Sequence, residues 1–195
     1  MTLLQIYIKN LLKEQLSTIA QSEEAEILIP GPPNRQARIA ELPAIQKYQS
    51  SQTNPDVLQN LLDMGMTKLF DSIIKTAGHS SHKIYIKKLK NEVKPIIKYH
   101  KKFFKALRPQ ALANEENISF DADVLKSAQS PSYPSGHTAQ AFYVAHKLSE
   151  IFPGLSRNFY RIADMIATSR LERGVHFPSD NEAGKVLAAK LADRI

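Results

Sequence analysis

The sequence contains no cysteine and no tryptophan among its 195 residues. Without cysteine, the chain has no disulfide framework, no thiolate nucleophile, no thiolate metal ligand and no thiol redox chemistry. It also lacks an uninterrupted apolar run near the roughly 20 residues that a membrane-spanning helix needs. Its length and its hydrophobic fraction of 43% suit one ordinary domain with its own core. We therefore expect a single domain over residues 1–195 with no membrane span.

The N-terminal residues do not fit the pattern of an export leader, so we expect none in this sequence. Lys9, Lys13 and Glu14 interrupt the N-terminal apolar stretch too early for a signal-peptide core, and no small-residue cleavage site follows. The sequence therefore predicts a cytoplasmic protein, or a periplasmic or secreted one if a leader has been removed.

Acidic residues are scarce in one stretch. From Lys83 to Arg108 there are ten basic residues and one acidic residue, Glu92, and this excess accounts for the formal net charge of +7. Such asymmetry indicates an anionic partner, which could be nucleic acid, a membrane surface or a phosphorylated substrate. Lysines on a helix more often form a solvated face, and we expect this of the stretch apart from Lys101 and Lys105. The alternative is that they attract phosphorylated substrates to a cleft.

Apolar periodicity predicts an all-α protein, a helical bundle without internal repeats. Residues 1–55 are expected to form an amphipathic N-terminal helix and a proline-rich segment that wraps the surface around a short helix, Arg35–Leu42. The residues from Arg108 to Pro134 are expected to form a loop. The other expected helices run from Asn54 to Gly78, from Lys83 to Leu107 with a break at Pro95, from Gly136 to Phe152, from Ser156 to Glu172, and onward from Ser179. In the last of these, Ser179 and Glu182 read as a capping box, and Val186, Leu187 and Leu191 form the apolar face.

Three short segments in the C-terminal half contain the reactive side chains. They are Lys101 with Arg108-Pro109, then Pro134-Ser135-Gly136-His137, then Ser169-Arg170 followed by His176 and Asp180. The first and third segments supply three cations, two of them guanidinium groups suited to bidentate phosphate contact. Ser135 and Gly136 lie where a helix begins, so free backbone N–H groups there can bind an anion.

Two histidines can divide the chemistry between them. His137 and His176 are candidates for a general acid and a nucleophile. Asp180 follows His176 by four residues, which is close enough to hold one ring nitrogen and leave the other free.

In this order, the three segments resemble the signature of the type 2 phosphatidic acid phosphatase and vanadium haloperoxidase superfamily. Within it, the chain most resembles the soluble bacterial class A non-specific acid phosphatases, which are all-helical. The signature region covers residues 98–191. The spacer Phe177-Pro178-Ser179 between His176 and Asp180 is closer to the membrane lipid-phosphatase branch.

The resemblance implies a role for each motif residue in hydrolysing phosphomonoesters without a metal or other cofactor. His176 would attack phosphorus, Asp180 would orient His176, and His137 would protonate the leaving oxygen and later activate water. The phosphoryl oxygens would be held by Lys101, Arg108, Ser135, Gly136 and Arg170. Phosphate or vanadate could occupy the site, and vanadate should inhibit.

Other functions stay open at this point. The substrate could be a nucleotide or a diphosphate, the site could serve a vanadium-dependent haloperoxidase, or the chain could be a basic anion-binding module with a vestigial site. Nucleic acid is the less favoured partner, a small phosphorylated substrate is the favoured one, and a homo-oligomer could form through the N-terminal helix. We expect structural roles for His79, His82, His100 and His146.

Overall fold

The computed structural model describes residues 28–51, 65–125 and 128–194. Within these residues the chain forms only helices, so the prediction of an all-α protein is confirmed. The helices are α2 (Arg35–Ser50), α4 (Met66–Thr76), α5 (Lys83–Glu92), α6 (Lys94–Phe104), α7 (Pro109–Glu115), α8 (Gly136–Ile151), a 3-10 turn (Pro153–Leu155), α9 (Ser156–Glu172) and α10 (Pro178–Ala192). The predicted N-terminal amphipathic helix and the start of the helix predicted from Asn54 lie outside the described residues.

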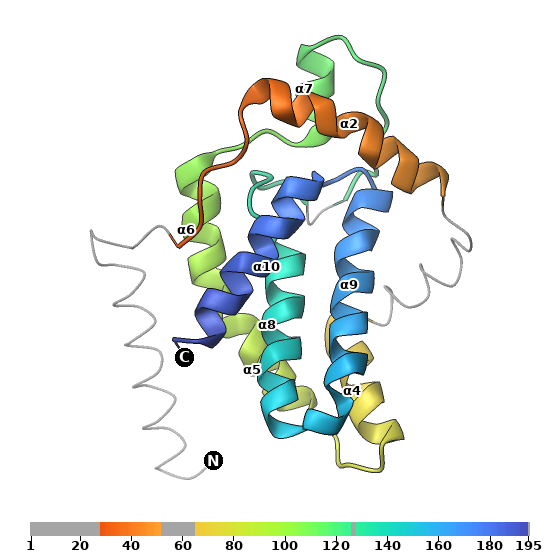
Figure 1. Ribbon diagram of the computed structural model, residues 1–195, viewed down its shortest axis with the longest axis vertical. Helices are drawn as coiled ribbons and strands as arrows, with labels where there is room; N and C mark the ends of the chain where they lie inside the picture. Colours follow the sequence, from red (N-terminus) through yellow and green to blue (C-terminus); the bar gives the residue numbers. More distant parts are fainter. Residues whose placement is uncertain (1–27, 52–64, 126–127, 195) are drawn as a thin grey trace.

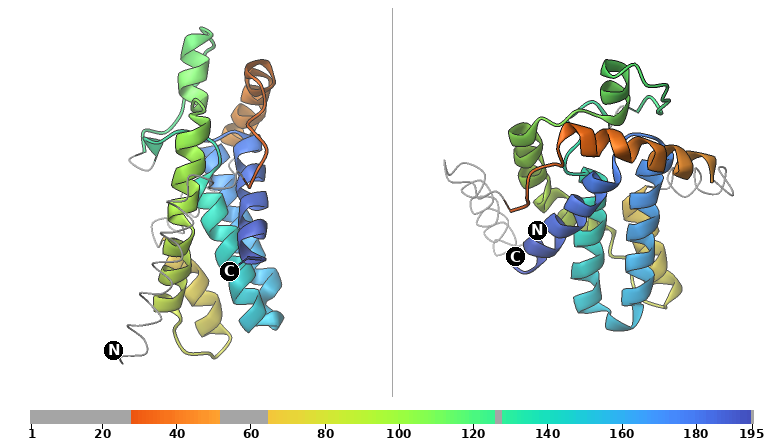
Figure 2. Two further views of the ribbon diagram at one scale, coloured as in Figure 1. Left: turned by 90° about the vertical axis from the view of Figure 1, so that its left-hand side faces the viewer. Right: turned by 45° about the horizontal axis from the view of Figure 1, so that its top comes forward.

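Helix α8 lies at the centre of the molecule and packs against both α9 and α10 (Figure 1). Helices α5 and α6 follow one another on a second side of α8, and α4 packs on α5 and α9 (Figure 2). Helix α2 crosses the end of the bundle where α8 and α10 begin and α9 ends, with α7 beside it (Figure 1). Two helix N-termini therefore share this end, and their dipoles make it favourable for an anion.

The core consists of two clusters of buried side chains. The larger one joins α4, α5, α6, α8, α9 and α10 and includes the fully buried rings of Phe70, Tyr143 and Phe159. The smaller one joins α2 and α7 to the start of α10 through Leu42, Ile45, Leu112, Ala113 and Phe177. The smaller cluster fixes α2 over the end of the bundle where the predicted site residues lie.

Helix α2 is longer than the predicted Arg35–Leu42 segment. It has 16 residues and continues through Pro43, and the Asn34 side chain caps it by accepting the Ala37 N–H at 2.9 Å. Proline removes one backbone hydrogen bond from a helix, but the burial of Leu42 and Ile45 on either side of it stabilises the longer helix here. The prediction of an extended surface segment is therefore wrong for these residues.

Several other predicted boundaries need correction. Helix α7 occupies seven residues of the predicted loop and starts at Pro109, which fits the first turn of a helix. Helix α6 ends at Phe104, before the predicted Leu107, because Lys105 adopts a left-handed conformation with φ 48°. Helix α4 is described only from Met66, after Gly65 with φ 76°. Val186 is 42% exposed and is not part of the core.

The start of α10 also differs from the prediction. The Phe177 backbone N–H donates to Asp180 Oδ2 at 3.0 Å, and the Ser179 hydroxyl donates to Glu41 of α2 at 2.8 Å. The predicted capping box of Ser179 and Glu182 is therefore wrong, because the helix begins earlier and Asp180 provides the cap.

Helices α8 and α10 approach each other very closely near their starts. A Cβ atom on Gly184 would lie 2.8 Å from the Ser135 carbonyl oxygen and 3.1 Å from Thr138 Cβ. The Ser135 N–H donates to the Asp180 carbonyl at 2.9 Å. The second and third sequence motifs are thus joined through the backbone.

Candidate active site

His176 and Asp180 form a buried pair at the start of α10. His176 Nδ1 lies 3.0 Å from Asp180 Oδ2, and both side chains are inaccessible to solvent. His176 Nε2 lies 3.0 Å from Arg108 Nη1, and a guanidinium can only donate. The imidazole therefore has its proton on Nδ1 and a lone pair on Nε2, directed at the cation.

The Asp180 carboxylate has four partners. Oδ2 accepts from His176, from the Ser132 hydroxyl and from the Phe177 N–H, while Oδ1 lies 3.4 Å from Arg38 Nη1. Burial alone would raise the pKa of Asp180, but the hydrogen bond and charge of His176, the charge of Arg38 and the Ser132 hydrogen bond hold this pKa below its ordinary value. Asp180 is therefore ionised and fixed in orientation.

Two of the predicted cations, Lys101 and Arg108, lie close to this pair, and among the described residues neither has a carboxylate within ion-pair distance. Lys101 Nζ donates to the Pro131 and Ser132 carbonyls, and Arg108 donates to the Ser130 and Val175 carbonyls. Burial, with the charge of Arg108 acting in the same direction, lowers the pKa of Lys101 to about 7.

Both guanidinium groups are affected in the same way. Burial lowers the pKa of Arg108 and of Arg170 to about 10 in each case, and neighbouring arginines add to the effect at Arg170. Cations crowded in this way favour the binding of an anion.

Two adjoining hollows meet at His137 and Gln140. The first, of about 540 Å³, contains five of the predicted residues: Lys101, Arg108, Gly136, His137 and His176. The second, of about 320 Å³, contains Lys90, His137, Ser169, Arg170 and Arg173. The proposed nucleophile lines the first hollow, and the proposed acid His137 lines both hollows.

His137 is neutral when no anion is present. Burial lowers its pKa to about 3, and the charges of Arg170, Lys90, Lys101 and Arg108 act in the same direction. A bound phosphate dianion would offset these cations and raise the pKa of His137, as a general acid requires.

Ser135 is the predicted phosphate ligand that the structure does not bring into either hollow. Its buried hydroxyl lies 2.8 Å from Thr138 Oγ1, which in turn donates to Asn181 at 2.8 Å. Its role toward phosphate stays a prediction, and the Gly136 N–H is the backbone donor at the helix start nearest to the first hollow.

Two residues that contact Asp180 were not found by sequence reasoning. Ser132 lies in the loop before α8, where no periodicity identifies it. Arg38 of α2 is only 5% exposed, and it lies on the same helix face as Leu42 and Ile45. The signal that could have identified Arg38 is a charged residue at a position on the apolar face of a helix.

The other histidines have structural contacts, as expected. Buried His100 accepts the Leu28 N–H at 3.1 Å and faces the Ile96 carbonyl, whereas His146 contacts the Tyr160 hydroxyl at 3.0 Å. The rings of His79 and His82 pack on Phe152.

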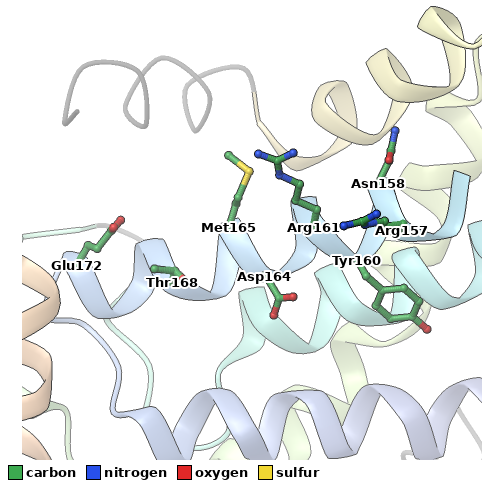
Figure 3. A pocket seen from close by; sticks show the side chains of 8 residues that line it. All are labelled: Arg157, Asn158, Tyr160, Arg161, Asp164, Met165, Thr168 and Glu172. Carbon is green, nitrogen blue, oxygen red and sulfur yellow. The ribbon is translucent and has the colours of Figure 1, made fainter. Parts of the chain in front are cut away.

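A larger hollow, of about 840 Å³, lies elsewhere, along the outward face of α9 (Figure 3). The described residues that line it all belong to that one helix, between Arg157 and Glu172, and none of them is a predicted site residue.

Residues 28–51, 65–125 and 128–194 contain no cluster of His, Asp and Glu arranged to hold a metal ion. None of their helices combines the length and apolarity needed to cross a lipid bilayer.

The geometry agrees with comparisons to known proteins. The family model described as PAP2 superfamily matches residues 92–192, which is more than half of the chain. The chain belongs to the PAP2 superfamily. This confirms the resemblance proposed from the three motifs, and all eight predicted site residues fall inside the matched PAP2 segment, whereas Arg38 falls outside it.

Two curated relatives are acid phosphatases. The chain is 40% identical over 58 residues to an acid phosphatase of Zymomonas mobilis, covering 30% of this chain and 22% of the relative. It is 34% identical over 90 residues to a non-specific acid phosphatase of Salmonella typhimurium, covering 46% of this chain and 35% of the relative. The chain thus matches only about a fifth to a third of these relatives.

A solved PAP2 structure shows the same fold. It is the transmembrane PAP2 type phosphatidylglycerolphosphate phosphatase from Bacillus subtilis, with a TM-score of 0.54 and 18% identity, covering 94% of this chain and 91% of that one. At this identity the likeness concerns the fold alone.

Proposed function

We propose that the chain is a phosphatase that hydrolyses phosphomonoesters through a phosphohistidine on His176, with no cofactor. The observation that carries the proposal is the direction of His176 Nε2. Asp180 holds the opposite ring nitrogen at 3.0 Å, so the Nε2 lone pair faces Arg108 and the hollow that Lys101 also lines. Membership of the PAP2 superfamily and two acid phosphatase relatives support the same chemistry.

In the first step, Nε2 of His176 attacks phosphorus and the bond between phosphorus and the leaving oxygen breaks. His137 gives its proton to that oxygen, and Asp180 stabilises the positive charge that develops on the His176 ring. Lys101, Arg108 and Arg170, with the Gly136 N–H, hold the phosphoryl oxygens and stabilise the charge of the transition state.

In the second step, water attacks the phosphohistidine. His137, now neutral, takes a proton from the water, the phosphorus–nitrogen bond breaks, and its electron pair returns to Nε2. Inorganic phosphate leaves, and both histidines regain their starting states.

The test compares turnover of p-nitrophenyl phosphate by the wild type, His176→Ala and His146→Ala, all with EDTA present. We expect the His176 variant to lose at least 10³-fold in kcat, a magnitude typical of removing a catalytic group. The His146 variant, altered outside the site, should keep its activity. Equal rates for the wild type and His176→Ala would rule out the mechanism.

A rapid-quench experiment tests the intermediate itself. Labelled phosphate should appear on the wild-type protein in an acid-labile, base-stable form, as expected for a phosphorus–nitrogen bond. His137→Asn should prolong its lifetime, because the second step then lacks its base.

A further inference from the structure

A row of lysines along α6 and at its C-cap lines the same hollow as His176. Lys94, Lys98, Lys102 and Lys105, named here the lysine row, line it together with Lys101 and Arg108. The hollow is also lined by Pro131, Gly136, His137 and Gln140, and none of the described residues that line it is acidic. The side chains of the row are exposed at its mouth.

The lysine row differs from other lysines between Lys83 and Arg108 in its carboxylate partners. Lys83 and Lys88 of α5 lie 3.8 Å from Asp71 and 3.5 Å from Glu92, respectively. Within the part of the chain that the structure describes, no carboxylate lies within ion-pair distance of the lysine row. The positive charge at the mouth of the hollow is therefore not balanced by the described residues.

The number of cations exceeds what one phosphoryl group requires. Lys101 and Arg108 line the hollow that contains His176, Arg170 lines the hollow that adjoins it at His137, and a phosphoryl dianion would balance most of their charge. A substrate with a neutral leaving group would leave the lysine row unused. The row lines the hollow that His137 shares, so it lies where the leaving group would extend.

We propose that the lysine row binds a second phosphate on the substrate, so that the chain prefers substrates whose leaving group is itself a phosphate, as in a nucleoside diphosphate. The proposal rests on the proposed function. The terminal phosphorus bonds to His176 Nε2, the bridging oxygen leaves with the remaining phosphate, and His137 supplies a proton to that oxygen. Water then releases the terminal phosphate, so one phosphoanhydride yields one phosphate and one monophosphate.

The experiment compares kcat/KM for ADP, AMP and p-nitrophenyl phosphate. The test variant is Lys98→Gln with Lys102→Gln and Lys105→Gln. The matched control is Lys68→Gln with Lys87→Gln and Lys190→Gln, which removes the same charge from exposed positions away from the hollow. We expect the wild type to favour ADP over AMP by at least tenfold, and the test variant to lose most of that preference while keeping p-nitrophenyl phosphate turnover within threefold.

The control variant should keep the wild-type ratio of ADP to AMP. The proposed second phosphate site is wrong if the wild-type ratio of kcat/KM for ADP to that for AMP is near one. It is also wrong if this ratio falls equally in the test and control variants. Added salt should reduce the ADP preference, because the row is exposed to screening. Loss of p-nitrophenyl phosphate turnover in His176→Ala is measured in parallel, so failure of the proposed function is distinguished from failure of the subsite.

A different observation carries a second proposal, concerning Arg38. Its Nη2 donates to the Leu107 carbonyl at 2.9 Å, its Nη1 lies 3.4 Å from Asp180 Oδ1, and its guanidinium stacks 4.1 Å above the Phe177 ring. Leu107 precedes Arg108, and Phe177 follows His176. One side chain of α2 therefore contacts the neighbours of both functional groups.

The buried carboxylate of Asp180 needs a counter-charge on the side away from His176. Ser132 and the Phe177 N–H both donate to Oδ2, and Arg38 is the cation next to Oδ1. A buried carboxylate without such a partner would favour its protonated form. We infer that Arg38 is a positioning residue, which keeps Asp180 ionised and oriented for the Nδ1–H of His176; this inference also rests on the proposed function.

The test uses Arg38→Met, which keeps much of the volume and removes the charge, and Arg38→Lys, which keeps the charge. Removing the cation leaves the Asp180 charge less compensated, so Asp180 should hold a proton on His176 more strongly. The acid limb of the kcat/KM profile should therefore move to higher pH in Arg38→Met. We also expect kcat to fall 10- to 100-fold with KM changed less than threefold, and Arg38→Lys to restore part of both effects.

This interpretation requires that the other charged and titratable groups around His176 and Asp180 keep their charges in the variants. They are Glu41 on α2, Lys101 on α6, Arg108 and Tyr133. Arg35→Met is the control, because Arg35 lies on the same helix and pairs with Glu115 and Glu116 of the α7 region, away from Asp180. If Arg38→Met lowers only the thermal stability and keeps the wild-type pH profile and kcat, Arg38 is merely structural and the inference fails.

Discussion

At the scale of single residues, the two oxygens of Asp180 face different kinds of partner. Oδ2 accepts three hydrogen bonds, whereas Oδ1 faces the guanidinium of Arg38. An asparagine amide has only one acceptor oxygen, so its NH₂ group must face either the donors or the cation. In one orientation the NH₂ group faces the three hydrogen-bond donors, and in the other it faces the guanidinium of Arg38. Either way, donor groups face one another in a buried site.

We therefore expect Asp180→Asn to impair both catalysis and stability. The fall in kcat should be on the order of 10³- to 10⁴-fold, because the required His176 tautomer is no longer favoured. The free energy of unfolding should fall by about 3–5 kcal/mol, because Arg38 loses its buried partner. Steady-state kinetics and urea unfolding measure the two effects. The exposed carboxylate in Asp164→Asn is the control, and a kcat within tenfold of the wild type would contradict the prediction.

The pKa of His137 gives a prediction for pH dependence. Because burial and nearby cations lower this pKa to about 3, the acid form is present in the free protein only at low pH. The kcat/KM should therefore decrease as the pH rises past the pKa of His137. Removing the Lys90 charge in Lys90→Met should raise that pKa and move the decrease to higher pH, which a pH profile detects. Lys87→Met, on the outer face of the same helix, should not move it.

Sequence reasoning could find the residues of the three motifs because their spacing is local. His176 and Asp180 are only four residues apart, and their contact forms where Asp180 in the first turn of α10 reaches back to the residues just before the helix. Arg38 could not be found in this way, since its contact with Asp180 depends on how α2 docks. The contact of the Ser135 hydroxyl with Thr138 could not be read from the sequence, and the role of this hydroxyl toward phosphate stays a prediction.

At the scale of helices, the contact between α8 and α10 determines the geometry of the site. Gly184 allows the two helices to meet where Ser135 donates to the Asp180 carbonyl. This contact sets the distance between the segment with His137 and the segment with His176.

Gly184→Ala should therefore separate the two segments. The added Cβ would lie 2.8 Å from the Ser135 carbonyl oxygen, which is backbone and cannot rotate away. We expect a loss of about 1–3 kcal/mol in stability and a decrease in kcat. Gly154→Ala is the control, since no atom lies within 4 Å of its added Cβ. Thermal unfolding and kinetics of both variants test this, and equal behaviour would contradict it.

Helix boundaries were predictable where proline or glycine follows a long apolar pattern. Helix α9 starts at Ser156 and ends at Glu172 as predicted, and α8 ends one residue before the predicted Phe152. Helix α7 was missed because its seven residues are too few for a periodic signal. Helix α2 was cut short at Pro43, because local propensity does not include the packing of Leu42 and Ile45 on α7 and α10.

At the scale of the whole molecule, basic side chains gather around the two hollows that meet at His137. The repulsion among Lys101, Arg108 and Arg170 lowers the stability of the ligand-free protein. A bound anion removes this repulsion, so phosphate binding and folding are linked.

Inorganic phosphate should therefore stabilise the fold. At a concentration of 100 Kd the gain is about 2.7 kcal/mol, measurable as a higher Tm. Because the pKa of Lys101 is lowered to about 7, Lys101 loses its proton as the pH rises above that value, and phosphate binding should weaken and take up protons there. Calorimetry in buffers of different ionisation enthalpy measures this uptake. Lys101→Met should abolish it, and pH-independent binding between pH 7 and 9 would contradict the prediction.

The contact between Arg38 and Asp180 also constrains when the protein can become active during synthesis. The two residues are separated by 142 positions in the chain. A ribosome releases Arg38 long before α10, and a pairing of such high sequence separation forms late in folding. A nascent chain that ends before α10 already contains His176 but lacks Asp180, and Arg38 on α2 has not yet met its carboxylate. On the proposed mechanism, phosphoryl transfer would therefore begin only after the two ends of the described fold have met.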